Sequence, residues 1–127
     1  MPTTTSLDVK ALTAILAVAG VGHLARPAIF EPMIPRGLPG SPRTVVHASG
    51  VAELACAAAL LHPRTRRVGG YATAALMAGV FPGNVQMAVT AHRSTRATRT
   101  WKLGTLARLP LQVPLITTAL KAARQGE

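Results

Sequence analysis

The sequence contains few aromatic residues, few charged residues and a single cysteine. Phe, Trp and Tyr make up 3% of its 127 residues, so an ordinary water-soluble core would lack its large fillers. Charged residues contribute 14%, well below the roughly 25% of a typical soluble domain. With Cys56 as the only cysteine, an internal disulfide and a cysteine metal cluster are excluded.

Small apolar residues are abundant, and they fall into four segments. Hydrophobic residues reach 49%, and the segments cover 7–25, 44–61, 68–91 and 103–120. Each is close to the roughly 20 residues that cross a bilayer, and the third contains no charge. We therefore predict an all-α protein: a single integral membrane domain over residues 1–127, folded as an antiparallel bundle of four transmembrane helices.

Two of these segments have alternative interpretations. In 7–25, Lys10 precedes an apolar stretch with small residues at 17–19, which also fits a cleaved signal peptide. Three further apolar segments favour a retained helix. Segment 103–120 is interrupted by Arg108, Pro110 and Pro114, which membrane helices tolerate when neighbours satisfy the freed carbonyls. A soluble helical bundle is disfavoured because the segments are apolar nearly all round.

The formal net charge of +10 has a distribution that suits a membrane protein. The basic residues gather between the apolar segments, and no aromatic residues interleave with them to stack on bases. We therefore expect a multi-pass protein of the cell membrane, with the lipid bilayer and no nucleic acid as partner. Six basic residues on one side against eight on the other do not define the orientation.

Residues 26–43 contain five of the ten prolines and connect the first two segments. So many prolines are incompatible with one regular helix. We predict an ordered cap over one end of the bundle.

Glu53 lies deep inside the second apolar segment, where a carboxylate costs several kcal/mol unless it is paired, hydrogen-bonded or protonated. Small residues at i±3 and i±4 predict that its face packs against another helix. Arg108 and Gln112 share a face of the fourth segment. We therefore expect Glu53 and Arg108 to form a buried charge pair, directly or through water.

The antiparallel topology places most polar residues of the segments in one half of the membrane, beneath the proline-rich connection. The catalytic candidates are Glu53, His23 and Arg108, and the candidate pocket-lining residues are His47, Asn84 and Gln112. Each also has a structural interpretation, as an ion-pair partner, a capping residue or an interfacial residue. Asn84 and Gln86 point to nearly opposite helix faces, so both cannot line one pocket well. The sequence contains no paired His motif of the kind that binds a metal ion, so we predict no metal site.

Four stretches together resemble the DoxX-like family of small four-helix bacterial membrane proteins: GVGHLARPAIFEPMIPRGLP at 20–39, HASGVAELACAAALL at 47–61, FPGNVQMAV at 81–89 and RLPLQVPLI at 108–116. The resemblance implies an integral membrane protein, in some members linked to quinone or thiosulfate oxidation and to redox homeostasis. It suggests a small membrane subunit that associates with a redox partner. The electron carrier would then be a diffusible quinone or a cofactor of the partner.

Two other functions are open. In a small membrane enzyme, such as an isomerase, cyclase or epoxide-opening enzyme, Glu53 would act as general acid or base on an apolar substrate. In a carrier for a small anion or lipid, Arg108 would lie at the binding site.

Overall fold

The computed structural model describes residues 5–34 and 37–125, and every regular element in these ranges is helical. The elements are α1 (Leu7–Ala25), α2 (Pro27–Phe30), the 3-10 helix η1 (Glu31–Met33), α3 (Pro42–Leu61), α4 (Arg66–Arg93) and α5 (Arg99–Gln125). The prediction of an all-α fold is confirmed. Each predicted apolar segment lies within one of the four long helices.

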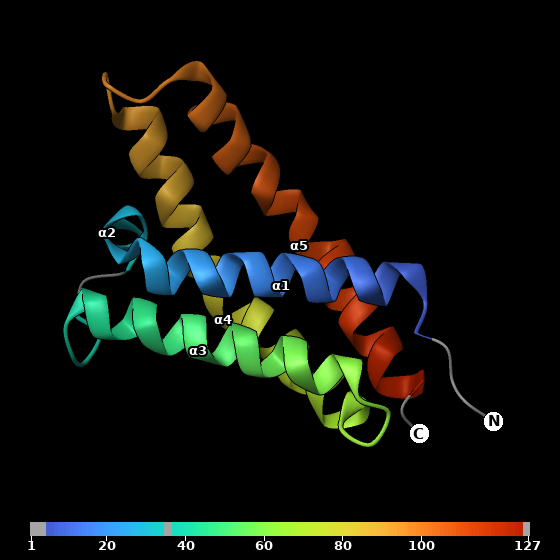
Figure 1. The fold of residues 1–127 in the computed structure, drawn as a ribbon. Coiled ribbons are helices and arrows are strands. Elements are labelled where there is room, and N and C mark those ends of the chain that lie inside the picture. The colour runs from blue at the N-terminus through green and yellow to red at the C-terminus, as the bar shows by residue number, and fades with distance from the viewer. Residues whose placement is uncertain (1–4, 35–36, 126–127) are drawn as a thin grey trace.

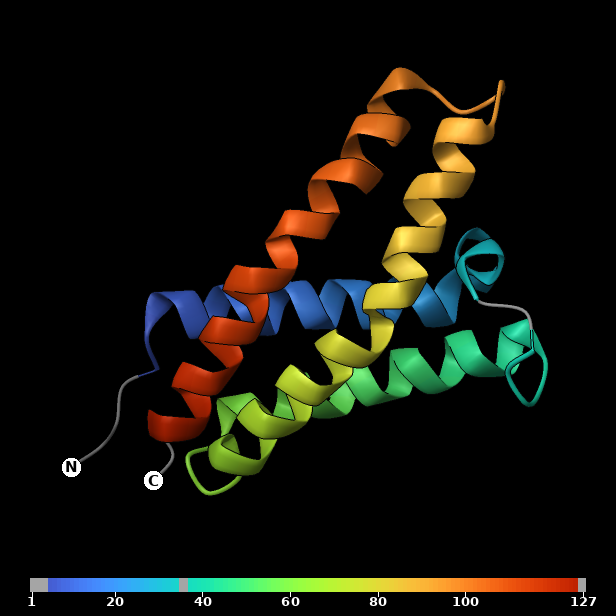
Figure 2. The same cartoon turned by 180° about the vertical axis from the view of Figure 1, so that it is seen from behind.

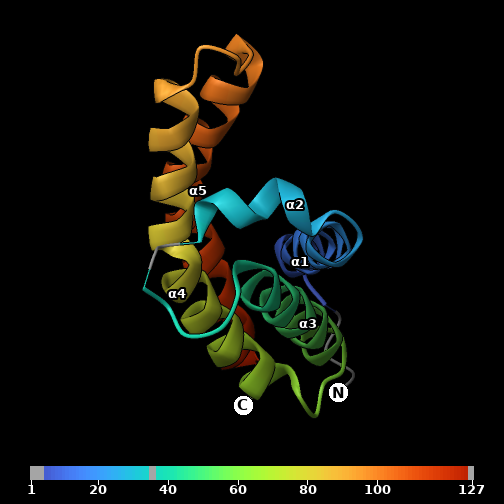
Figure 3. The ribbon, with the colours of Figure 1, turned by 90° about the vertical axis from the view of Figure 1, so that its left-hand side faces the viewer.

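The four long helices form two antiparallel pairs that cross (Figure 1). In one pair α1 lies beside α3, and in the other α4 lies beside α5. Seen along α1 and α3, the α4–α5 pair extends well past the first pair on one side (Figure 3). About midway, α4 changes direction (Figure 2), and Pro82 lies inside this helix. A proline removes one helical hydrogen bond and is the usual cause of such a bend.

The outer surface is unusually apolar for a water-soluble protein, and the interior holds polar residues beside its apolar core. Many large aliphatic side chains are exposed, including Val18, Val51 and Val68. Several polar residues are buried instead: Thr13, His23, Glu53, Arg66, Thr73, Asn84, Thr105 and Gln112. Three helices, α1, α3 and α4, are long and apolar enough to cross a membrane. These features together are typical of a membrane protein.

Small residues allow the helices of each pair to approach closely. A methyl group on Gly20 of α1 would lie 2.9 Å from the carbonyl oxygen of Gly50 in α3, and one on Gly50 would lie 3.0 Å from that of Gly20. On α4, a methyl group on Gly70 would meet the backbone of Ala119 and Ala123 in α5. Both interfaces therefore depend on direct contact between backbones.

The proline-rich connection is more helical than predicted. It contains α2 and η1, and it ends in the first turn of α3. Proline fits these places because Pro27 and Pro42 occupy first helical positions, where no backbone N–H is needed. The Ser41 hydroxyl then caps α3 by accepting a hydrogen bond from the Thr44 N–H.

Two side-chain contacts tie residues 27–34, hereafter the cap, to the bundle. Gln86 on α4 donates from Nε2 to the carbonyl oxygens of Pro32 at 2.8 Å and Ile34 at 3.2 Å. Arg43 at the start of α3 donates from Nε to Glu31 at 2.8 Å. The cap is thus held against both helix pairs.

At the opposite end of α3, one of the basic residues between the second and third apolar segments, Arg66, has a buried side chain. Only 1% of its surface is exposed. Its Nε donates to the Leu60 carbonyl at 2.9 Å, and one terminal nitrogen donates to the Leu61 carbonyl and the Thr5 hydroxyl. A cation at these carbonyls satisfies the free end of α3 and opposes the negative end of its dipole.

We expect Arg66→Ala to lower the free energy of unfolding by about 2 kcal/mol, because charged hydrogen bonds to buried carbonyls are lost. Thermal unfolding in detergent micelles, followed by circular dichroism, measures the change. Arg64→Ala is the matched control, since Arg64 is an exposed residue of the same turn. Equal stability of the two variants would contradict a structural role for Arg66.

Candidate functional site

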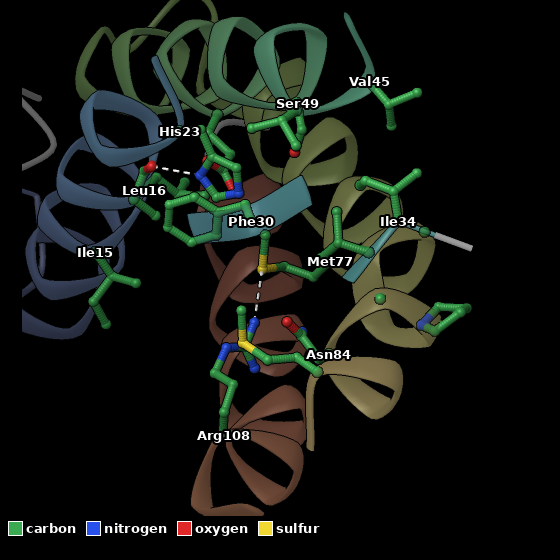
Figure 4. Close-up of a pocket in the computed structure, with 18 of the residues that line it drawn as sticks. Ile15, Leu16, His23, Phe30, Ile34, Val45, Ser49, Met77, Asn84 and Arg108 are labelled. Carbon is green, nitrogen blue, oxygen red and sulfur yellow. Dashed lines mark hydrogen bonds and ion pairs between the residues drawn. The ribbon is translucent and has the colours of Figure 1, made fainter. Parts of the chain in front are cut away.

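A cavity of about 420 Å³ lies beneath the cap, bordered by all four long helices. Its walls are mainly apolar, with Ile15 and Leu16 from α1, Val45 and Val46 from α3, and Met77 from α4. Phe30 and Ile34 of the cap also border it (Figure 4). Four of the polar residues predicted from sequence line it: His23, Glu53, Asn84 and Arg108.

The close packing of α1 on α3 brings His23 and Glu53 together. Each residue lies one turn after a contact glycine, His23 after Gly20 and Glu53 after Gly50. Side chains lean toward the N-terminus of their own helix. Because the two helices are antiparallel, the two side chains lean toward each other, and His23 Nδ1 lies 3.1 Å from Glu53 Oε2.

The hydrogen bonds of His23 define its protonation pattern. Its Nδ1 lies 2.6 Å from the Ala19 carbonyl oxygen, which can only accept, so Nδ1 carries a hydrogen. This hydrogen points to Ala19, and Glu53 Oε2 has no hydrogen-bond donor although it is within ion-pair distance. Phe30 covers the imidazole, with ring centres 4.0 Å apart and nearly parallel planes. In the neutral ring, Nε2 is left as the basic nitrogen.

Arg108 lies at the other end of the cavity, with Met77 between it and His23 (Figure 4). Its terminal nitrogens contact Gln112 Oε1 at 3.4 Å and Met77 Sδ at 3.9 Å, both long contacts. Gln112 donates in turn to the Met77 carbonyl. The expected direct pair of Glu53 with Arg108 is absent among the described residues, because α1 supplies the partner of Glu53.

The remaining polar candidates have different positions. Asn84 is buried, with 8% of its surface exposed, and its Nδ2 has no hydrogen-bond partner among the described residues. Gln86 lies on nearly the opposite face of α4 from Asn84, and its side chain donates a hydrogen bond to the cap. Gln112 stands behind Arg108, and His47 does not border the cavity.

Sequence reasoning missed two residues that shape the site. Phe30 lies in the proline-rich connection, where nothing indicated that its ring would stack on His23. Met77 separates the two polar ends, but its position in a long uncharged segment resembles that of any packing residue. Only the helix register and the packing angle reveal these two roles.

The arrangement joins an acid–base pair to an apolar cavity. A histidine beside a carboxylate can take up and return a proton, and its apolar surroundings keep water from competing. Within residues 5–34 and 37–125, no three His, Cys, Asp or Glu side chains gather as a metal site would require. The donors at the Arg108 end offer hydrogen bonds to an oxygen of a bound molecule.

Comparison with known proteins gives one family. Residues 12–123 match the family model described as Domain of unknown function (DUF8561). No curated protein and no solved structure matches the chain.

Proposed function

The chain belongs to the DUF8561 family of domains of unknown function, and we propose that it is a multi-pass protein of the cell membrane. In this proposal its cavity binds a small, largely apolar molecule, and the His23–Glu53 pair exchanges a proton with it. The reaction class is acid–base isomerisation, in which one carbon of the molecule loses a proton and another carbon receives one.

The observation that carries the proposal is one buried oxygen of Glu53, which lies beside His23 but receives no hydrogen bond from the described residues. Glu53 is 5% exposed and borders the cavity, and this oxygen is its Oε2. A buried polar atom without a partner costs about 1–3 kcal/mol. A group retained at such a cost is a candidate for function.

In this proposal, α5 is a fourth helix that crosses the membrane. It has 27 residues, or about 40 Å of helix, and it packs along α4. Its polar Thr105 and Gln112 are buried, while Leu106 and Val113 are exposed. Arg108 faces the cavity, where its charge is sheltered from lipid. With four spans, the start of α1 and the end of α5 lie on the same side.

The chemistry follows from the positions of the protons. His23 Nε2 accepts a proton from a carbon of the bound molecule, and the nearby Glu53 carboxylate stabilises the resulting imidazolium. The imidazolium exchanges this proton slowly with solvent, which in D₂O supplies deuterium, and then gives a proton to a second carbon. Arg108 and Asn84 donate hydrogen bonds to an oxygen of the molecule and so fix its position.

We expect Glu53→Gln to keep the fold and the bound molecule but to slow proton exchange at least a hundredfold. The uncharged amide no longer stabilises the His23 imidazolium, and the general base catalysis that depends on it contributes about 10²–10⁴-fold. The protein is purified in nanodiscs, and its small molecules are identified by mass spectrometry. The molecules that it enriches are then incubated with the protein in D₂O, and deuterium on their carbons is counted.

Ser49→Phe is the control for the cavity. Ser49 lines the cavity, and the phenyl ring of the variant would fill it. This variant should lose the enriched molecule. Equal enrichment by wild type and Ser49→Phe would refute binding in the cavity. Equal deuterium incorporation by wild type and Glu53→Gln would refute the role of the pair.

A second candidate is the redox subunit that the DoxX-like resemblance implies. It is favoured by donors at one end of the cavity and a proton-exchanging pair at the other. A quinol bound there would release two protons toward His23 and Glu53 and pass two electrons to a cofactor of a partner protein. Enrichment of a quinone together with a partner protein, without carbon-bound deuterium, would favour this candidate.

A further inference from the structure

We propose that the molecule bound in the cavity is an anion, an apolar chain ending in a carboxylate or phosphate that binds Arg108 and Asn84. This inference rests on the proposed function for the cavity itself. It adds the chemical class of the molecule and its orientation.

The acidic side chains of the described residues already have basic neighbours. The described residues include three of the four acidic residues, and each lies beside a basic side chain: Asp8 beside Lys121 at 2.7 Å, Glu31 beside Arg43 at 2.8 Å, and Glu53 beside His23 at 3.1 Å. Arg108 is within ion-pair distance of none of them. Its charge therefore lacks a direct counter-ion in the described part of the chain.

A counter-ion would stabilise the Arg108 guanidinium in its surroundings. The two side-chain contacts of Arg108, to Gln112 and Met77, are long. The cavity that it borders is lined mainly by apolar side chains, among them Val80 and Met87. A guanidinium in such a place is costly unless it is paired. Glu53 borders the same cavity, but its carboxylate lies within ion-pair distance of His23 and not of Arg108.

Asn84 provides an independent indication of an acceptor. Its Nδ2 is a buried donor without a partner among the described residues, and it borders the same cavity as Arg108. Two donors at one end select an acceptor oxygen, and the charge of one of them selects a negative oxygen. The apolar remainder of the molecule would then lie along Leu16 and Met77, toward His23.

The same chemistry has two sources in a membrane, a free fatty acid and an anionic phospholipid. Both present a negative oxygen group on an apolar chain. A single-chain acid therefore serves as the probe, and the lipid composition is changed separately to distinguish the two sources.

The probe is decanoic acid carrying a photoreactive diazirine on its chain, and its methyl ester is the neutral counterpart. Each is added at pH 8, where the acid is ionised, to the protein in phosphatidylcholine nanodiscs. After illumination, labelled cavity residues are identified by peptide mass spectrometry. We expect the acid to label the cavity at least tenfold more than the ester.

The variants assign this preference to Arg108. We expect Arg108→Gln to reduce labelling by the acid about tenfold and to leave labelling by the ester unchanged. Arg108→Lys keeps the charge and should retain most of the labelling. Arg96→Gln removes the same charge from an exposed position outside the cavity and should have no effect.

Equal labelling by acid and ester in the wild type, lost in Ser49→Phe, would overturn the anion proposal and leave the cavity function standing. No labelling of cavity residues by either probe would instead refute the cavity function. If phosphatidylglycerol in the nanodiscs suppresses labelling by the acid, the anion is supported and its source is a phospholipid. If it does not, a free acid is supported.

Discussion

Gly70→Ala is expected to lower the free energy of unfolding by about 3 kcal/mol, the upper end of the typical cost of overpacking, because the atoms that it meets are rigid. The added methyl group would lie 2.5 Å from the Ala123 nitrogen and 2.6 Å from the Ala119 carbonyl oxygen. Both are backbone atoms, so no side-chain rotation relieves the clash. The α4–α5 pair must separate along its length. Unfolding titrations with sodium dodecyl sulfate, followed by circular dichroism, measure the loss.

Gly104→Ala is the matched control for this prediction. A methyl group on Gly104, in α5, meets no atom within 4 Å. Alanine is favoured over glycine inside a helix, by about 0.5–1 kcal/mol, so this variant should be equally or slightly more stable. A Gly70→Ala protein as stable as Gly104→Ala would mean that the backbones of α4 and α5 do not touch at this point.

The helices were predictable because long apolar runs without charge leave few alternatives. The predicted segment 7–25 coincides with α1 (Leu7–Ala25), and the other three segments lie inside α3, α4 and α5. Glu53 stood out for the same reason, as the one acidic residue deep in such a run. The proline-rich connection was harder, because Pro27 and Pro42 begin helices as readily as they end them.

The partners within the site were not predictable, because they depend on the rotation of one helix against another. Sequence spacing placed Arg108 beneath the proline-rich connection and Glu53 deeper in the membrane, and both residues line one cavity. Which basic residue contacts Glu53 is decided by the Gly20–Gly50 contact, and it selects His23. Arg66 shows the same limit, since a basic turn gives no sign of which arginine folds inward.

The His23–Glu53 pair allows stability and function to be separated by a double replacement. His23→Leu leaves a buried carboxylate without its basic neighbour, and we expect it to lower the free energy of unfolding by about 3 kcal/mol. Adding Glu53→Leu removes that carboxylate and fills the place with an apolar side chain. The double variant should regain most of the lost stability, because well-packed apolar residues often replace a buried ion pair without loss.

Proton exchange should behave differently from stability in these variants. Because both groups take part in moving the proton, His23→Leu, Glu53→Leu and the double variant should each lose exchange about 10²–10⁴-fold. Unfolding in sodium dodecyl sulfate and deuterium incorporation are measured on the same preparations. A stable double variant without exchange is the expected result, because it separates the cost of the buried pair from its function. A double variant less stable than His23→Leu would instead assign the pair to packing, and one that retains exchange would exclude both residues from the chemistry.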